Sequence, residues 1–255
     1  MRALCFAFAM YSKIPMPRVE WEKRALSMAL CLFPLVGCAI GALLWGWMAL
    51  SNWLGFGSLF FAAGALFLPI AVSGGIHLDG FCDTCDALSS HQSRERKLEI
   101  LKDSHTGAFA IICCALYLII FLACWSEVGH TSRAAAALAL GPVLSRALSG
   151  LFAATLPNAR GSGLLATFTE PMDGHRARVI LGLWCAGAAV AMVLLDPWTG
   201  SSALAGAALV CLYYVTMSRR QFGGITGDLA GFFLQLCELG MVLAAVIGQK
   251  IEVLI

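Results

Sequence analysis

Three aspartates stand at helical spacing in a chain that is otherwise mostly apolar. Asp79, Asp83 and Asp86 are separated by four and three residues, and on a helix this spacing places all three carboxylates on one face. Because like charges at this distance repel, a divalent cation or a polar substrate is the expected partner of the face. Hard carboxylate oxygens suit Mg²⁺ or Mn²⁺, which proteins typically share with substrate phosphates. The sequence therefore predicts a metal-assisted site here.

A second short helix is expected to follow. Ser93 has the residue type of an N-cap, and residues 96–103 are predicted to be helical, with Glu99 and Asp103 four apart on one face. Two short helices of this kind can present five carboxylates to each other.

Two other interpretations of this region stay open. In the first, it is a solvated hairpin whose acids pair with Arg94, Arg96 and Lys102. In the second, Cys82-x-x-Cys85 is a zinc or redox motif, although no second pair of cysteines completes a zinc site. The neighbouring aspartates favour the metal-assisted site over zinc or redox chemistry.

A glycine-rich stretch begins the last apolar segment. Glycines let backbone amides approach an oxyanion, and the start of a helix favours negative charge, so this stretch predicts a phosphate or metal role. Its acid would either cap the helix or join the metal site. The stretch contains Arg219, Arg220, Gly223, Gly224, Thr226 and Asp228.

A third candidate region combines Arg146 with the polar loop 156–163. An arginine inside an apolar segment is costly and usually faces a polar cavity or a carboxylate. Arg146 and Glu238, which lies about halfway along the last apolar segment, are expected either to pair within the protein or to line a substrate channel.

The composition places these regions in a membrane protein. Of the 255 residues, 60% are hydrophobic and 13% are charged, and the mean hydropathy is +0.82, whereas a soluble domain carries about 25% charged residues. We expect an all-α polytopic bundle that forms one catalytic domain over residues 1–255, with a short second span that can be broken or re-entrant. Seven spans are expected, at 30–50, 57–74, 107–126, 134–156, 178–196, 202–217 and 229–248.

The basic residues indicate the orientation of this bundle. Fourteen of the 17 Lys and Arg residues lie before the first span, in 75–106, in 157–178 and at 219–220, which the expected spans put on one side. By the positive-inside rule that side is the cytoplasm. The expected location is thus the cytoplasmic (inner) membrane. The site is expected to face the cytoplasm and to receive an anionic substrate. We do not expect nucleic acid as a partner.

Three polar motifs together resemble one known family. The chain carries GGIHLDGFCDTCD at 74–86, RKLEILKDSHTG at 96–107 and GGITGD at 223–228. In order and spacing these are similar to the motifs of the cobalamin synthase family, the adenosylcobinamide-GDP ribazoletransferases. The segments 11–17 and 33–37 resemble the N-terminal region of that family as well, so the resemblance extends from about residue 6 to residue 240.

The resemblance implies a late step of vitamin B12 assembly. Members join α-ribazole, or its 5′-phosphate, to adenosylcobinamide-GDP and release GMP, using Mg²⁺ at the membrane. Phosphoryl transfer needs charge neutralisation and positioning more than covalent help from the protein, in agreement with the carboxylates, arginines and glycines above. The expected partners are these substrates and the lipid bilayer, and the Gly37-x-x-x-Gly41 spacing is compatible with a homo-oligomer.

This reaction suggests a role for each candidate residue. The expected metal ligands are Asp79, Asp83, Asp86 and Asp228. The catalytic candidates are Asp83, Asp86, Asp103 and Glu99, of which the last two would orient or deprotonate the attacking ribose hydroxyl. The candidate substrate-binding residues are Arg94, Arg96, Arg146, Arg219, Arg220, Gly223, Gly224 and Thr226.

Two further functions remain as alternatives. A CDP-alcohol phosphatidyltransferase also uses spaced aspartates in membrane helices, but its motif begins Asp-x-x-Asp-Gly-x-x-Ala-Arg, whereas here Asp79-Gly80 is followed by further aspartates without Ala-Arg. A cation transporter would use intramembrane carboxylates and glycine breaks for ion passage. The expected placement of the acids near the cytoplasmic side disfavours the transporter.

Overall fold

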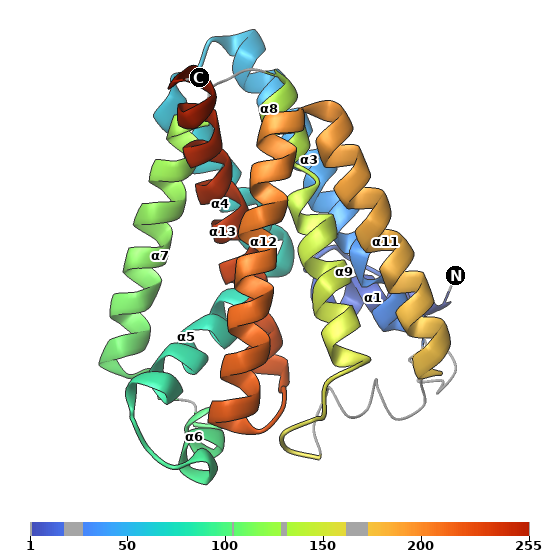
Figure 1. The fold of residues 1–255 in the computed structure, drawn as a ribbon, viewed down its shortest axis with the longest axis vertical. Helices are drawn as coiled ribbons and strands as arrows, with labels where there is room; N and C mark the ends of the chain where they lie inside the picture. The colour runs from blue at the N-terminus through green and yellow to red at the C-terminus, as the bar shows by residue number, and fades with distance from the viewer. Residues whose placement is uncertain (1, 18–27, 104, 129–131, 162–172, 255) are drawn as a thin grey trace.

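The computed structural model describes residues 2–17, 28–103, 105–128, 132–161 and 173–254. These residues form a bundle of helices (Figure 1) and contain no strand, only one isolated parallel bridge between Asn158 and Ile225. The all-α fold class expected from the sequence is confirmed.

The described helices follow one another along the chain. In chain order they are α1 (Arg2–Tyr11), η1 (Leu30–Leu32), α3 (Phe33–Leu54), α4 (Ser58–Ser73), α5 (Ile76–Ser89), α6 (Arg94–Ile100), α7 (Ala108–Glu127), α8 (Ser132–Leu138), α9 (Gly141–Ala153), α11 (Gly174–Leu195), α12 (Pro197–Met217), the π-helical turn η2 (Ser218–Phe222) and α13 (Gly227–Leu254).

Six helical segments of the described chain are long and apolar enough to cross a membrane, which makes this a polytopic membrane protein. They are Leu30–Leu54, Ala108–Glu127, Arg133–Ala153, Gly174–Leu195, Pro197–Phe222 and Gly227–Leu254.

The expected second span, 57–74, corresponds to α4, and a sharp break follows it. Helices α4 and α5 would together form a seventh span, but they are bent by 94° relative to each other. The break lies at Gly74 and Gly75, whose φ angles of 64° and 78° belong to the left-handed region that favours glycine. Because α4 ends there, α5 is turned out of line with it, and α5 carries the three aspartates.

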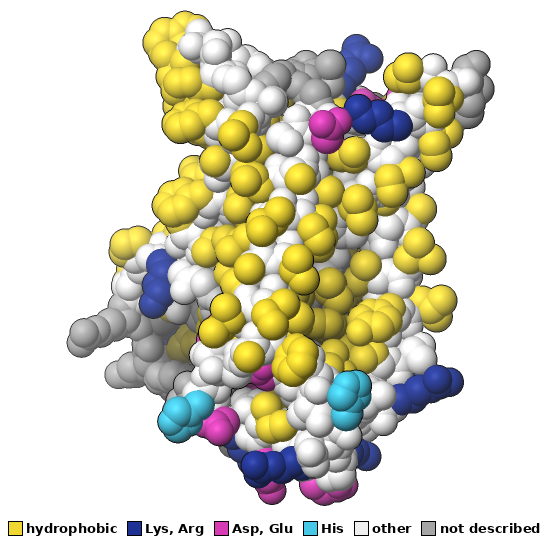
Figure 2. Space-filling model, turned by 90° about the vertical axis from the view of Figure 1, so that its left-hand side faces the viewer, with side chains coloured by type: hydrophobic (Ala, Val, Ile, Leu, Met, Phe, Trp, Pro, Cys, Tyr) yellow, Lys and Arg dark blue, Asp and Glu magenta, His cyan; other side chains and the backbone are white. Residues whose placement is uncertain are grey.

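The surface has an apolar middle and charged ends. Exposed apolar side chains project from the long helices, for example Ile119, Leu183 and Leu212. Figure 2 shows hydrophobic side chains over the middle of one face and basic, acidic and histidine side chains grouped at its lower end. That end holds α6, η2 and the loop after α9 (Figure 1), so these basic segments share one end of the bundle, as predicted.

Small residues let α3 pack closely on the segment of α8 and α9. A Cβ atom at Gly37 would lie 2.7 Å from the Cα of Val143, and one at Gly41 would overlap the carbonyl of Ala139. The Gly37-x-x-x-Gly41 face is therefore buried by internal helix packing. Its proposed use as an oligomer contact was wrong, because the chain's own helices cover it.

A buried ion pair joins α9 to α13. Arg146 Nη1 donates to Glu238 Oε1 at 2.7 Å and to the Pro142 carbonyl at 3.0 Å, and Ser145 Oγ donates to the same glutamate oxygen at 2.8 Å. Arg146 is 2% exposed and Glu238 is 5% exposed. Charges this deep in an apolar bundle are tolerated only when they are paired, so the internal pairing considered from the sequence is the one observed.

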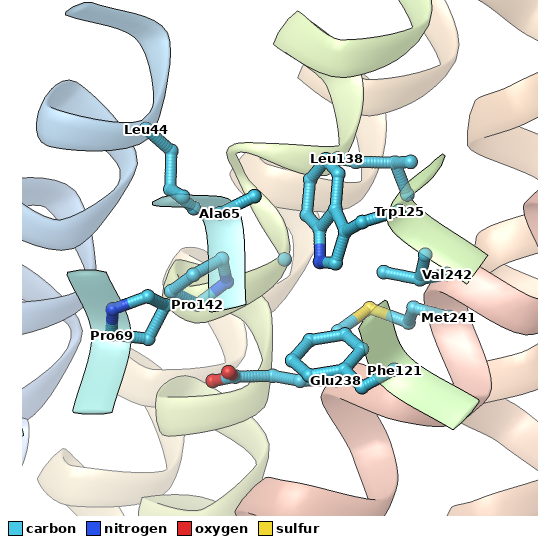
Figure 3. A pocket seen from close by; sticks show the side chains of 11 residues that line it. Leu44, Ala65, Pro69, Phe121, Trp125, Leu138, Pro142, Glu238, Met241 and Val242 are labelled. Atoms are coloured by element: carbon cyan, nitrogen blue, oxygen red, sulfur yellow. The ribbon is translucent and has the colours of Figure 1, made fainter. Parts of the chain in front are cut away.

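A small cavity adjoins this ion pair. It measures about 10 Å³ and lies between α3, α4, α7, α9 and α13. Figure 3 shows the indole nitrogen of Trp125 pointing into it, with Glu238 along its edge. A water molecule needs roughly 10–15 Å³, so this cavity accommodates at most one water and is not a substrate site.

The ion pair leads to a stability prediction. Glu238→Ala leaves Arg146 charged and unpaired in the bundle, so we expect the free energy of unfolding to fall by about 3–5 kcal/mol. Thermal or denaturant unfolding of the detergent-solubilised protein measures this change. The control is Glu127→Ala, which removes the partner of Lys250 in an exposed pair and should leave the transition nearly unchanged.

A second variant separates loss of the pair from loss of volume. Arg146→Met combined with Glu238→Leu replaces both charges by apolar groups and should recover most of the lost stability. Equal destabilisation by the single and the double variant would contradict an important role for the unpaired charge.

Candidate active site

The helix that carries the three aspartates, α5, packs against the beginning of α13. We call Asp79, Asp83, Asp86 and Asp228 the acidic cluster. The carboxylates of Asp79, Asp86 and Asp228 repel that of Asp83 electrostatically, and the guanidinium of Arg160 opposes this repulsion. The sequence predicted that Asp228 would join the aspartates of α5, and the structure brings them together.

Two glycines bring α5 and α13 into close contact. A Cβ atom at Gly80 would lie 2.7 Å from the carbonyl oxygen of Asp228, and a Cβ atom at Gly231 would lie 2.9 Å from that of His77. Any larger residue at either position would force the helices apart. Gly80, which the sequence offered only as part of a motif, therefore sets the distance between the carboxylates of the two helices.

Thr226 caps α13. Its Oγ1 accepts a hydrogen bond from the backbone N–H of Leu229 at 3.2 Å, the geometry of an N-cap. The threonine is 2% exposed, and its hydroxyl lies 3.5 Å from Asp228 Oδ2. Because the threonine provides the cap, the carboxylate of Asp228 is available to the acidic cluster, and its place in the first helical turn favours a negative charge there. The proposed contact of Thr226 with substrate stays a prediction.

Asp86 has a structural role that the sequence did not show. Its two carboxylate oxygens accept hydrogen bonds from the backbone N–H groups of Gly107 at 2.6 Å and Ala110 at 2.8 Å. These amides belong to the start of α7, where the helix dipole favours an anion. Asp86 thus fastens α5 to α7, whereas the carboxylates of Asp79 and Asp83 have no such amide partners among the described residues.

Arg160 is the cation of the acidic cluster. Its Nη2 lies 3.1 Å from Asp228 Oδ2. The position depends on a short backbone pairing, in which Ala159 N–H donates to the Ile225 carbonyl and Ile225 N–H donates to the Pro157 carbonyl, both at 2.9 Å. The sequence placed Arg160 in a polar loop but did not select it as a site residue. The sequence feature that could have identified it is an arginine in a turn next to a span, on the same side of the membrane as the aspartates.

The two glycines expected to cradle a phosphate have other roles. The N–H of Gly223 donates to the Arg219 carbonyl and that of Gly224 to the Ser218 carbonyl, both at 3.2 Å. A Cβ atom at Gly223 would overlap the guanidinium of Arg94, and one at Gly224 would overlap the Pro157 carbonyl. The expectation that these amides are free for an oxyanion is therefore corrected: the glycines instead allow two neighbouring segments to come close.

Helix α6 packs against η2. Lys97 is buried, and its Nζ donates to Gln221 Oε1 at 2.5 Å, while Arg94 lies over Gly223. This contact brings Arg94 to the glycine-rich stretch, as a substrate-binding role would require. Arg219 and Arg220 lie on the same turn with exposed side chains.

The second acidic helix is shorter than predicted. Helix α6 begins at the expected cap, Ser93, but ends at Ile100, so Asp103 lies beyond it. Glu99 pairs with Arg96 at 2.7 Å on an exposed surface. The carboxylate of Asp103 accepts from the N–H of His105 at 3.0 Å. The expected arrangement of five facing carboxylates is therefore wrong, since these two acids have local partners.

The Asp103 contact also affects its titration. The ring Nδ1 of His105 lies 2.6 Å from Asp103 Oδ1. This ring contact, together with the backbone hydrogen bond, lowers the pKa of Asp103 below its usual value. A carboxylate with a lowered pKa is a weaker base, which makes Asp103 a poor candidate for deprotonating a hydroxyl.

The remaining candidate residues lie apart from the acidic cluster. Arg146 is bound to Glu238 in the bundle interior, and its substrate-binding role stays a prediction. Cys82 and Cys85 are free thiols that lie against protein, so the part of the chain described here gives no support to a zinc or disulfide interpretation. Among the described residues, no group of three or more His, Cys, Asp or Glu side chains is placed so that it could hold a metal ion.

Comparisons with known proteins identify the family of this chain. Residues 3–246 match the sequence profile of the cobalamin-5-phosphate synthase family. An adenosylcobinamide-GDP ribazoletransferase of Lachnoclostridium phytofermentans is 39% identical over 98% of this chain and 95% of its own length. Proteins of the same name from Pseudomonas savastanoi pv. phaseolicola and Clostridium perfringens are 36% and 32% identical, over 94% and 96% of this chain and 96% and 98% of their own lengths.

Among solved structures, none matches this chain. The family assignment therefore rests on sequence, over nearly the full length and across all three polar motifs. The chain belongs to the cobalamin-5-phosphate synthase family.

Proposed function

We propose that this protein is an adenosylcobinamide-GDP ribazoletransferase that acts in the last steps of cobalamin synthesis. It transfers the adenosylcobinamide phosphate moiety of adenosylcobinamide-GDP to α-ribazole, or to its 5′-phosphate, and releases GMP. The family and the names of the relatives support this activity. They do not favour a phosphatidyltransferase or a cation transporter. The structural observation that carries the proposal is the meeting of Asp79, Asp83, Asp228 and Arg160 at one end of the bundle.

The reaction is a substitution at phosphorus. A ribose hydroxyl oxygen of the acceptor forms a bond to the phosphorus nearer the cobinamide, and the bond from that phosphorus to the bridging oxygen breaks. GMP leaves with the bridging oxygen, and the hydroxyl proton passes to a carboxylate of the acidic cluster, Asp79 or Asp83. Because such a transfer depends mainly on positioning and charge neutralisation, the protein needs no covalent intermediate.

Mg²⁺ fits the residues of this site. The donors available on Asp79, Asp83 and Asp228 are hard carboxylate oxygens, the type that Mg²⁺ prefers. Mg²⁺ usually binds proteins through one or two carboxylates and completes its shell with water and substrate phosphates, so a closed protein cage is not required. When bound, the ion would neutralise negative charge on the pyrophosphate.

The basic residues would bind the phosphate oxygens. Arg160 already lies beside Asp228, and Arg94 lies beside the glycine-rich stretch. Arginine suits this role because its planar guanidinium can donate two parallel hydrogen bonds to a phosphate. Arg219 and Arg220, exposed on the neighbouring turn, would attract the anionic substrate.

The charge distribution supports an inner-membrane location. Basic residues of α6, η2 and the loop after α9 lie at the end of the bundle that holds the acidic cluster (Figure 1). With the positive-inside rule, this end faces the cytoplasm, where the nucleotide-activated substrate is available to it.

The first prediction for this function concerns Asp83. Asp83→Asn keeps the size of the side chain but removes its charge, and we expect GMP release to fall by about 100-fold or more. The assay uses purified protein in detergent with adenosylcobinamide-GDP, α-ribazole and Mg²⁺, and it is scored for GMP. Asp173→Asn, which changes an exposed helix cap, is the matched control and should retain activity. Near-normal turnover by Asp83→Asn, with normal membrane insertion, would refute the role of Asp83.

The second prediction concerns metal binding without turnover. Calorimetric titration of the protein with Mg²⁺, or spin-resonance titration with Mn²⁺, should show binding that is lost when Asp79→Asn and Asp83→Asn are combined. Asp103→Asn changes an exposed carboxylate with its own partner and should bind metal as the original protein does. If all three proteins bind the ion equally, the acidic cluster is not the metal site.

The third prediction concerns Arg160. Arg160→Ala removes a cation from the phosphate site, so kcat/KM for adenosylcobinamide-GDP should fall by about tenfold or more. The same change frees Asp228 from its ion pair and should strengthen Mn²⁺ binding. Arg176→Ala, at an exposed pair with Asp173, should change neither quantity. An unchanged kcat/KM in Arg160→Ala would exclude the phosphate role.

A further inference from the structure

A cavity of about 240 Å³ opens beside the acidic cluster, between α1, η1, α5, α9 and α13. Asp79 and Asp228 of the acidic cluster line it, so a molecule held inside would reach the carboxylates. The reaction described above gives this cavity no role. Its size and chemistry indicate what it binds.

The wall of the cavity is aromatic and apolar. Tyr11 and Phe33 lie with their ring centroids 4.1 Å apart, and the His77 ring lies 5.8 Å from that of Phe33. Leu30, Ala153 and Leu234 contribute apolar surface. Aromatic and aliphatic walls of this kind favour a flat, largely apolar ring, which can stack on them.

One polar atom of the residues that line this cavity has no partner. His77 lines the cavity and is 6% exposed, and its Nε2 has no hydrogen-bond partner among the described residues. Buried polar side-chain atoms are nearly always hydrogen-bonded. A bound molecule can supply the missing partner: with the proton on Nε2, the imidazole donates to an acceptor such as an unprotonated ring nitrogen.

We infer that this cavity binds the heteroaromatic base of the ribazole acceptor, with His77 Nε2 donating to the free nitrogen of the benzimidazole ring. The inference rests on the proposed function. The base lies between Phe33, Tyr11 and the aliphatic side chains, and the ribose extends toward Asp79 and Asp228, which brings its hydroxyl to the acidic cluster. His77 is then a substrate-binding residue that determines specificity for the acceptor.

The other parts of the two substrates fit the cavity less well. A corrin ring with its amide side chains is much larger than 240 Å³, so the cobinamide must remain outside, at the end of the bundle. Guanine carries several donors and acceptors along its edges and would leave most of them unpaired against an apolar wall. A lipid chain would match the apolar surface but would leave His77 without a partner.

The test compares acceptor binding with donor binding. His77→Phe keeps a flat ring but removes the donor, and Ala153→Leu fills part of the cavity. For each variant, Kd for α-ribazole is measured by calorimetry in detergent, and KM is measured separately for α-ribazole and for adenosylcobinamide-GDP. We expect Kd and KM for α-ribazole to rise at least tenfold in both variants, with KM for adenosylcobinamide-GDP within twofold of the original.

Two further variants keep the result interpretable. His77→Gln retains an N–H donor and should bind α-ribazole more tightly than His77→Phe. Ala42→Leu introduces the same change as Ala153→Leu into a different cavity, near α8 at the other end of the molecule (Figure 1), and should alter neither KM. Unfolding temperatures of all four variants identify any that fail to fold.

The outcomes separate this inference from the proposed function. If the original protein releases GMP but His77→Phe and the folded Ala153→Leu variant keep its KM for α-ribazole, the cavity inference is overturned and the function stands. If the original protein releases no GMP from the two substrates, the proposed function itself fails. Retention of a phospholipid in the purified protein, lost in Ala153→Leu while α-ribazole binding persists, would assign the cavity to lipid and also overturn the inference.

Discussion

The close contact between α5 and α13 is the constraint on which the candidate site depends. Gly80 and Gly231 have no side chains, so each helix reaches the backbone of the other. Without that contact the carboxylates of α5 and Asp228 would belong to separate surfaces. The bend of 94° between α4 and α5 contributes to the same arrangement, because it turns the acidic helix out of line with the span that precedes it. Helix packing at two glycines thus converts two distant motifs into one acidic cluster.

The protein accommodates its charged side chains in two different ways. In the interior, Arg146 and Glu238 satisfy each other, and Ser145 completes the network, so the charges hold α9 against α13. At the basic end of the bundle, the acidic cluster has more carboxylates than nearby cations, with Arg160 beside Asp228. The first arrangement is internally neutral, so neither charge is left unpaired in the interior. The second keeps an excess of negative charge, which favours binding of a cation and, through it, of a pyrophosphate.

The site joins a polar surface to an apolar cavity. Asp79 and Asp228 belong to both, which suits a reaction whose acceptor has an apolar aromatic base and a polar ribose. The acceptor base would use the aromatic wall of Phe33 and Tyr11, whereas the charged donor would stay at the end of the bundle among the arginines. A membrane bundle is well suited to this division, since its interior is apolar and one of its ends carries basic residues.

The sequence alone determined the fold class, the shortness of the second span, the charged end of the bundle and the carboxylates of α5, because hydropathy, helical spacing and charge are local properties of the chain. It also identified the family through three motifs. Tertiary contacts decided the rest. Asp86 reaches the amides of α7, Thr226 caps α13, Arg160 pairs with Asp228, and Asp103 lies beyond the end of α6. Each of these depends on a partner brought close by helix packing, or on where a helix ends, and residue type and spacing do not specify either one.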